Sequence, residues 1–136
     1  MEDALEDAAP VSPRLARRHG WDPTVVRNED SVDLFVRLHR RSEEKTYVLR
    51  LRYLADWQVA GRRETFVNPD DLGEEGVQFW PRGVRAVNPD HVQNGVHTPA
   101  ICIPGVWGYD SVLHPNEPRE ASVTRFLHDL QTVMNE

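Results

Sequence analysis

The sequence predicts an α+β domain with an N-terminal helix, an antiparallel meander of about four strands, and a C-terminal helix packed on the sheet. Three observations predict this fold: a capped helical segment near Ser12, two alternating apolar runs between residues 31 and 53, and a helical apolar stripe near the C-terminus. A chain of 136 residues without an internal repeat or linker is typical of one domain, 1–136.

The first helix is indicated by its boundaries. Ser12 and Pro13 form a typical helix start, and Gly20 is a typical stop. The residues between them are mostly basic, which is typical of a solvent-facing helix surface. Residues 1–11 are acidic and rich in alanine, and we expect them to form a flexible lead-in.

The meander is indicated by a change in period. Apolar residues alternate with other residues over 31–38 and again over 47–53, with a polar connector at 40–45. This pattern predicts an antiparallel hairpin, each strand having one apolar face. A short third strand is expected at 65–67, closed by a turn at 68–71, and residues 72–100 are expected to be irregular with one more short strand.

The last helix is indicated by apolar residues spaced three and four apart, beginning near Ser122. They are Val123, Phe126, Leu127, Leu130, Val133 and Met134. Such a stripe is the face that a helix buries against a sheet.

Composition narrows the functional classes. The net charge of −6 argues against a protein that binds nucleic acid through phosphate attraction. No apolar run approaches the roughly 18 residues of a membrane span, and the acidic start is unlike a secretory signal. One cysteine cannot form an internal disulfide, which suits a reducing compartment. We therefore expect a cytoplasmic protein without nucleic-acid or membrane partners.

The chemistry-bearing candidates gather around Cys102, with His91, His97 and His114 near it in sequence. Three interpretations remain open. In the first interpretation Cys102 is a small buried hydrophobic residue, as most lone cysteines are. Alternatively, Cys102 binds zinc together with His97 and His114. In the third interpretation the thiol is a nucleophile that carries an acyl group, assisted by a neighbouring imidazole or amide.

The order of these features resembles a known family. Residues 99–105 read Pro-Ala-Ile-Cys-Ile-Pro-Gly, Trp107 follows closely, and residues 127–133 read Leu-His-Asp-Leu-Gln-Thr-Val. Together with the meander before them, they resemble the ubiquitin-conjugating (E2) enzymes, particularly divergent bacterial members. The resemblance runs from about Ser31 to the C-terminus and implies a UBC-like fold; in bacterial relatives it also suggests a role in antiviral defence.

The resemblance implies roles for three residues. Cys102 would carry the C-terminus of a ubiquitin-like protein as a thioester. The His-Pro-Asn tripeptide that precedes the family's cysteine is absent, but Asn94 stands eight residues before Cys102 and His114 twelve after it. His114 would assist the incoming amine. Asn94 or the backbone around Gly105 would stabilise the oxyanion.

The same resemblance implies the partners: an E1-like adenylating enzyme, a ubiquitin-like protein and a target protein that bears the acceptor lysine. No cofactor is needed, because a thioester already holds the acyl-transfer potential. The alternatives are a non-catalytic E2-like module that binds a ubiquitin-like protein or an operon partner, and a small zinc-binding domain that uses Cys102 with His97 and His114.

Overall fold

The computed structural model describes residues 12–57, 62–103 and 123–136. The expected lead-in at 1–11 lies outside these residues. The elements are α2 (Pro13–His19), β1 (Thr24–Arg27), β2 (Val32–Arg40), the 3₁₀ turn η1 (Arg41–Glu43), β3 (Lys45–Tyr53), β4 (Arg63–Asn68), β5 (Asp71–Glu75), η2 (Val77–Phe79), β6 (Val87–Asn88), β7 (Val92–Gln93), β8 (Val96–His97), β9 (Ala100–Ile101) and α4 (Val123–Met134). None of the described helices is long and apolar enough to cross a membrane.

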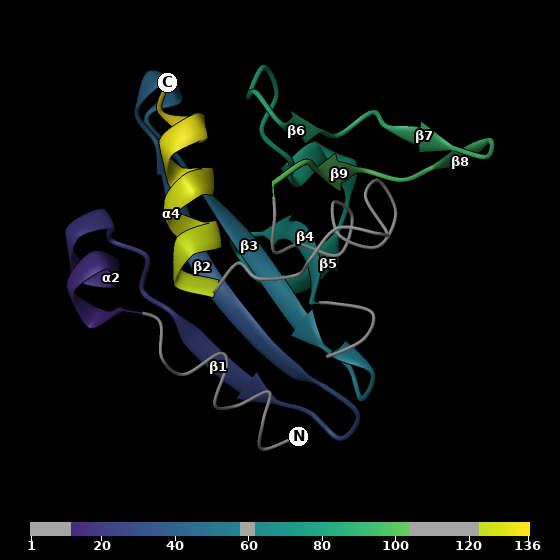
Figure 1. The fold of residues 1–136 in the computed structure, drawn as a ribbon, viewed down its shortest axis with the longest axis horizontal. Coiled ribbons are helices and arrows are strands. Elements are labelled where there is room, and N and C mark those ends of the chain that lie inside the picture. Colours follow the sequence, from purple (N-terminus) through teal and green to yellow (C-terminus); the bar gives the residue numbers. More distant parts are fainter. Residues whose placement is uncertain (1–11, 58–61, 104–122) are drawn as a thin grey trace.

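Five strands form one antiparallel sheet in the order β1-β2-β3-β4-β5, so strands adjacent in sequence are also adjacent in space. β2 and β3 pair along their whole length, with Val32 opposite Tyr53 and Arg40 opposite Lys45. Figure 1 shows α4 lying against one face of this sheet, over β2. The predicted α+β class and antiparallel meander are confirmed.

Beyond β5 the chain forms two small antiparallel ribbons, β6 with β9 and β7 with β8. Figure 1 shows the β7–β8 ribbon reaching away from the five-stranded sheet. One short strand was expected in this region, and the structure has four of two residues each.

The main core lies between the sheet and α4. The alternating residues of β2 and β3 and the stripe of α4 are all buried: Val32, Leu34, Val36, Leu38, Tyr47, Leu49, Leu51, Tyr53, Val123, Phe126, Leu127, Leu130, Val133 and Met134. Each large apolar side chain removed from water contributes about 1.5–3 kcal/mol. The predicted apolar faces are therefore confirmed, and they position α4.

The opposite face of the sheet is also partly buried, which the alternation did not predict. Phe35, Val48 and Val67 form a second cluster there. Beside it the buried Asp33 carboxylate accepts two hydrogen bonds from Arg52, at 2.8 and 2.9 Å. The ion pair satisfies a charge that would otherwise be costly to bury.

The ends of α2 agree with the prediction. The Ser12 side chain accepts a hydrogen bond from the Leu15 N–H at 3.3 Å, and Gly20 takes a left-handed conformation (φ 67°) that closes the helix. This is the geometry that a serine cap and a glycine stop provide. At the other end of the chain, the described part of α4 begins at Val123; Ser122, near which the helix was expected to begin, lies outside the described residues.

Among the described residues the sheet has five strands, where about four were expected. β1 contains Val25 and Val26, which are both partly exposed, so no alternation marked it. β5 reads Asp-Leu-Gly-Glu-Glu, a composition that is unfavourable in strands, and it pairs with β4 through a register shift at Val67 and Asn68. The turn between β4 and β5 is present as predicted; Asn68 accepts a hydrogen bond from the Asp70 N–H at 2.9 Å.

Candidate functional site around Cys102

Cys102 follows β9 directly and lies between two buried isoleucines. Ile101 is fully buried and Ile103 nearly so, whereas Cys102 is partly exposed. In an extended segment successive side chains point to opposite sides, so burial of the isoleucines turns the thiol outward. The backbone N–H of Cys102 donates to the carbonyl oxygen of Ala86 at 2.6 Å. The thiol is therefore held at a defined place on the surface.

The thiol opens on a pocket of about 280 Å³ between the β6–β9 ribbon and α4. Its lining residues are Arg85, Ala86, Cys102, Ile103, Asp129, Thr132 and Val133. The structure thus brings the cysteine and the C-terminal half of α4 together, although they are far apart in sequence. A pocket next to a partly exposed thiol can admit an extended chain or a side chain of a partner.

The electrostatic environment favours the neutral thiol. Burial, and after it the negative charge of Glu64 on β4, raises the pKa of Cys102. The Arg85 guanidinium lines the same pocket but is paired with Glu136, to which its Nε donates at 3.0 Å. At a given pH these surroundings therefore lower the fraction of Cys102 that is present as the reactive thiolate.

Asp129 supplies the pocket with a negative group. Its side chain is about half exposed, and its carboxylate lies 4.0 Å from Arg125 and 3.8 Å from His128. Asp129 and Thr132 are three residues apart on α4, so they lie on one face of the helix. Asp129 and Arg85 were not predicted as site residues; the helical spacing puts Asp129 next to the apolar stripe, but nothing in the sequence indicates that it lies near Cys102.

Asn94 occupies the turn of the β7–β8 ribbon. It has φ 52° and is followed by Gly95 with φ 77°. Two consecutive positive φ values define the tight hairpin turn for which Asn-Gly is the preferred pair. The turn and the end of β9 lie at opposite ends of this segment in Figure 1. The structure does not bring Asn94 to Cys102.

His91 and His97 form hydrogen bonds within the segment that contains the same ribbon. A ring nitrogen of His91 donates to the carbonyl oxygen of Thr98 at 3.0 Å, and one of His97 donates to that of Pro89 at 2.8 Å. Within 12–57, 62–103 and 123–136, no three His, Cys, Asp or Glu side chains are grouped to hold a metal ion. His114, the third member of the zinc alternative and the expected helper of Cys102, lies outside the described residues, as do Gly105 and Trp107.

Comparison with known proteins adds no relative: the chain matches no family model, no curated protein and no solved structure.

Proposed function

We propose that this protein is an E2-like conjugating enzyme, with a UBC-like arrangement of the meander and C-terminal helix. It would accept a ubiquitin-like protein as a thioester on Cys102 and pass it to a lysine amine. The observation that carries the proposal is the partly exposed Cys102, held at the end of β9 beside a pocket that α4 closes on one side. The resemblance of residues 99–105 to the family's thioester segment supports it.

The first step is an exchange of thioesters. The sulfur of Cys102 attacks the carbonyl carbon of the modifier's C-terminus, which is held as a thioester on an E1-like adenylating enzyme. A new carbon–sulfur bond forms, the old one breaks, and the leaving thiolate takes the proton that Cys102 loses. No cofactor takes part, since ATP is consumed in the earlier adenylation.

In the second step the lysine Nζ of a target protein attacks the same carbonyl carbon. A carbon–nitrogen bond forms, Cys102 leaves as the thiolate, and the proton lost by the amine restores the thiol. Asp129, on the pocket wall, is placed to attract a lysine ammonium, and His114 would take up its proton. Because Asn94 lies in the β7–β8 turn, we assign the oxyanion donor to the backbone around Gly105 in preference to Asn94.

A second candidate is a non-catalytic E2-like module that binds a ubiquitin-like protein or another partner. The raised pKa of Cys102 favours this candidate, because a neutral thiol is a poor nucleophile. In this function the pocket would still be a contact surface. Cys102 would then be replaceable without loss of binding.

Intact-mass spectrometry separates the two candidates. The protein is mixed with ATP, a candidate ubiquitin-like protein and its E1-like enzyme, and the mass of the chain is measured without reductant. Conjugating activity increases the mass of the wild-type chain by the mass of one modifier minus that of one water molecule, and the mass of the Cys102→Ala variant does not change. Two results together would instead identify a binding module. The E1-like enzyme would be charged without any adduct forming on this protein, and Cys102→Ala would bind the modifier as well as the wild type does.

A further inference from the structure

Within the described residues, α2 is attached to the rest of the domain by few contacts. Ala16 is the only buried residue of this seven-residue helix, and Leu15 is partly buried against the core. The N–H of Ser12, the helix cap, donates to the side-chain oxygen of Thr124 on α4 at 3.2 Å. A helix this short has little stability of its own, so its packing against neighbouring elements decides whether it stays in place.

The residue that follows the helix stop is anchored separately. Trp21 is fully buried, its indole N–H donates to Gln131 at 3.2 Å, and its carbonyl oxygen accepts from the Arg37 N–H at 2.7 Å. These bonds hold Trp21 on β2 and α4 through groups that do not belong to α2. Gly20 lies between the helix and this anchor with φ 67°, so the chain can change direction there without strain.

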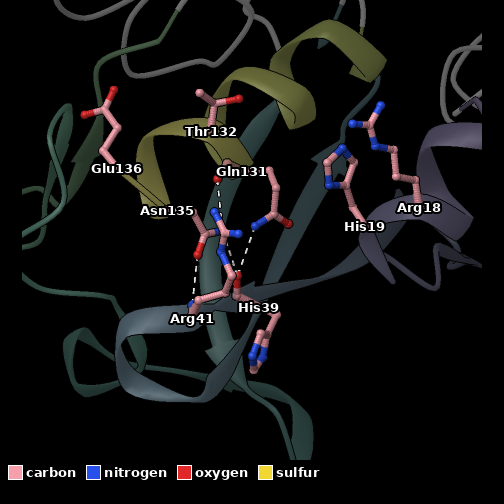
Figure 2. Close-up of a pocket in the computed structure, with 8 residues that line it drawn as sticks. All are labelled: Arg18, His19, His39, Arg41, Gln131, Thr132, Asn135 and Glu136. Atoms are coloured by element: carbon pink, nitrogen blue, oxygen red, sulfur yellow. Dashed lines mark hydrogen bonds between the residues drawn. The ribbon is translucent and has the colours of Figure 1, made fainter.

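His19, the last residue of α2, lies at the contact between this helix and α4. Its ring stacks on Trp21 with the centroids 5.2 Å apart and meets the His128 ring edge-on at 6.0 Å. Figure 2 shows the ring beside Arg18, at the junction of α2 with α4. The Nε2 atom of His19 is shielded from solvent and has no hydrogen-bond partner. A protonated ring would need an acceptor at this nitrogen, so the docked position favours the neutral imidazole.

The charged and titratable groups around this ring are mainly positive. Those that the structure describes near His19 or its neighbour His128 are Arg18, His39, Arg41, His128, Asp129 and Glu136. The Asp129 carboxylate lies 3.8 Å from His128 and 4.0 Å from Arg125, and Glu136 is held by Arg85. Burial, followed by the charges of Arg18 and His128, lowers the pKa of His19.

We propose that α2 is a pH-sensitive element, which protonation of His19 releases from α4 while the sheet and α4 stay folded. In the docked position a charged ring is repelled by Arg18 and His128 and lacks an acceptor, whereas water hydrates it once the helix swings away about Gly20. Release would expose the side of α4 that carries Thr124 and His128. The inference does not depend on Cys102 and goes beyond the conjugating function.

The direction of the pH dependence follows from the neutral ring. Because docking lowers the pKa of His19, the helix is docked above the ordinary histidine pKa of about 6.5. Docking is lost as the pH falls below that value and through the lower pKa of the docked state. The ratio of docked to released helix falls about tenfold for each unit by which docking lowers this pKa.

The test is an NMR titration of the whole chain from about pH 7.5 to about pH 5. The C2 proton of the His19 ring is followed together with the backbone amides of residues 14–20, and the amides of β2, β3 and α4 report on the remaining fold. His19→Gln keeps a polar side chain that cannot be charged. His91→Gln is the matched control, because His91 forms its hydrogen bond to Thr98, in the segment of the β7–β8 ribbon.

We expect the amides of α2 to move toward the values of an unstructured chain with the same midpoint as the His19 ring, while those of β2, β3 and α4 keep their positions. His91→Gln should retain this transition and His19→Gln should remove it. If His19→Gln is released at every pH, the coincidence of the two midpoints in the wild type decides. Three results would overturn the proposal: α2 amides that stay unchanged while the ring titrates, the same transition in His19→Gln, or a simultaneous change throughout the sheet.

Discussion

The Cys102 backbone N–H donates to the carbonyl oxygen of Ala86, and Ala86 takes a left-handed conformation, with φ 68°, in the turn that presents this oxygen. For a residue other than glycine this conformation costs roughly 1–2 kcal/mol. The strained turn lies directly against the candidate nucleophile. It couples the position of the thiol to the backbone of a neighbouring loop.

Replacing Ala86 by valine should destabilise the protein. A β-branched residue is disfavoured more strongly than alanine at positive φ, so we expect a loss of about 1–3 kcal/mol in the free energy of unfolding. Urea unfolding measures it. Ala86→Gly is the matched control, and it should stay within about 1 kcal/mol of the wild type, because glycine adopts this conformation freely. Equal losses in both variants would mean that packing, and not φ, governs this position.

Glu64 should suppress the reactivity of Cys102. Removing its charge in Glu64→Gln lowers the thiol pKa, so the thiolate fraction near neutral pH rises, about tenfold for each unit of pKa. Burial remains, so the pKa stays above its ordinary value. Because Cys102 is the sole cysteine, the pH dependence of alkylation by iodoacetamide reports on it alone. Glu74→Gln removes an exposed charge from β5 and should leave the profile unchanged; an unchanged profile in Glu64→Gln would contradict the prediction.

Gln131 should be among the costliest residues to truncate. Gln131→Ala leaves the Trp21 indole N–H without its acceptor and removes one of the two donors to the His39 carbonyl, in a buried place. An unsatisfied buried group costs about 1–3 kcal/mol, and the vacated volume adds to it. We expect a loss of about 2–4 kcal/mol in thermal or urea unfolding. Gln93→Ala, on the small β7–β8 ribbon, should change little, and a similar small effect at Gln131 would refute its structural role.

Asp129 should affect transfer to lysine and not thioester formation. If its carboxylate attracts the acceptor ammonium, Asp129→Asn slows discharge to free lysine by about tenfold while charging from the E1-like enzyme is unchanged. Single-turnover discharge measures this. Asp90→Asn, which neutralises an exposed carboxylate paired with Arg82, is the control. Equal rates in Asp129→Asn and Asp90→Asn would remove Asp129 from the mechanism.

Local patterns predicted the elements that bury a regular face. The alternation in β2 and β3, the cap and stop of α2, and the stripe of α4 each depend on neighbours in sequence, so the sequence alone reveals them. β1 was not predicted, because Val25 and Val26 are both partly exposed and the strand is held by its hydrogen bonds to β2.

The pockets could not be predicted in the same way. Arg85, Cys102 and Asp129 meet only because α4 packs beside the β6–β9 ribbon. The pocket lined by Arg18, Arg41 and Asn135 is likewise assembled from α2, η1 and α4, which are far apart in sequence. Conversely, the Asn94 spacing that matched the family's pattern has a local explanation, since Asn-Gly forms the β7–β8 turn.

The most direct test of the conjugating function is the chemistry of the bond at residue 102. Wild type, Cys102→Ser and Cys102→Ala are each incubated with ATP, the ubiquitin-like protein and a charged E1-like enzyme, then separated on gels with and without thiol reductant. We expect the wild type to give a band heavier by one modifier that reductant removes. Cys102→Ser should give the same band, which resists reductant because the bond is an oxygen ester. Cys102→Ala should give no such band. A wild-type chain that stays uncharged, or a band that persists in Cys102→Ala, would contradict the function proposed for Cys102.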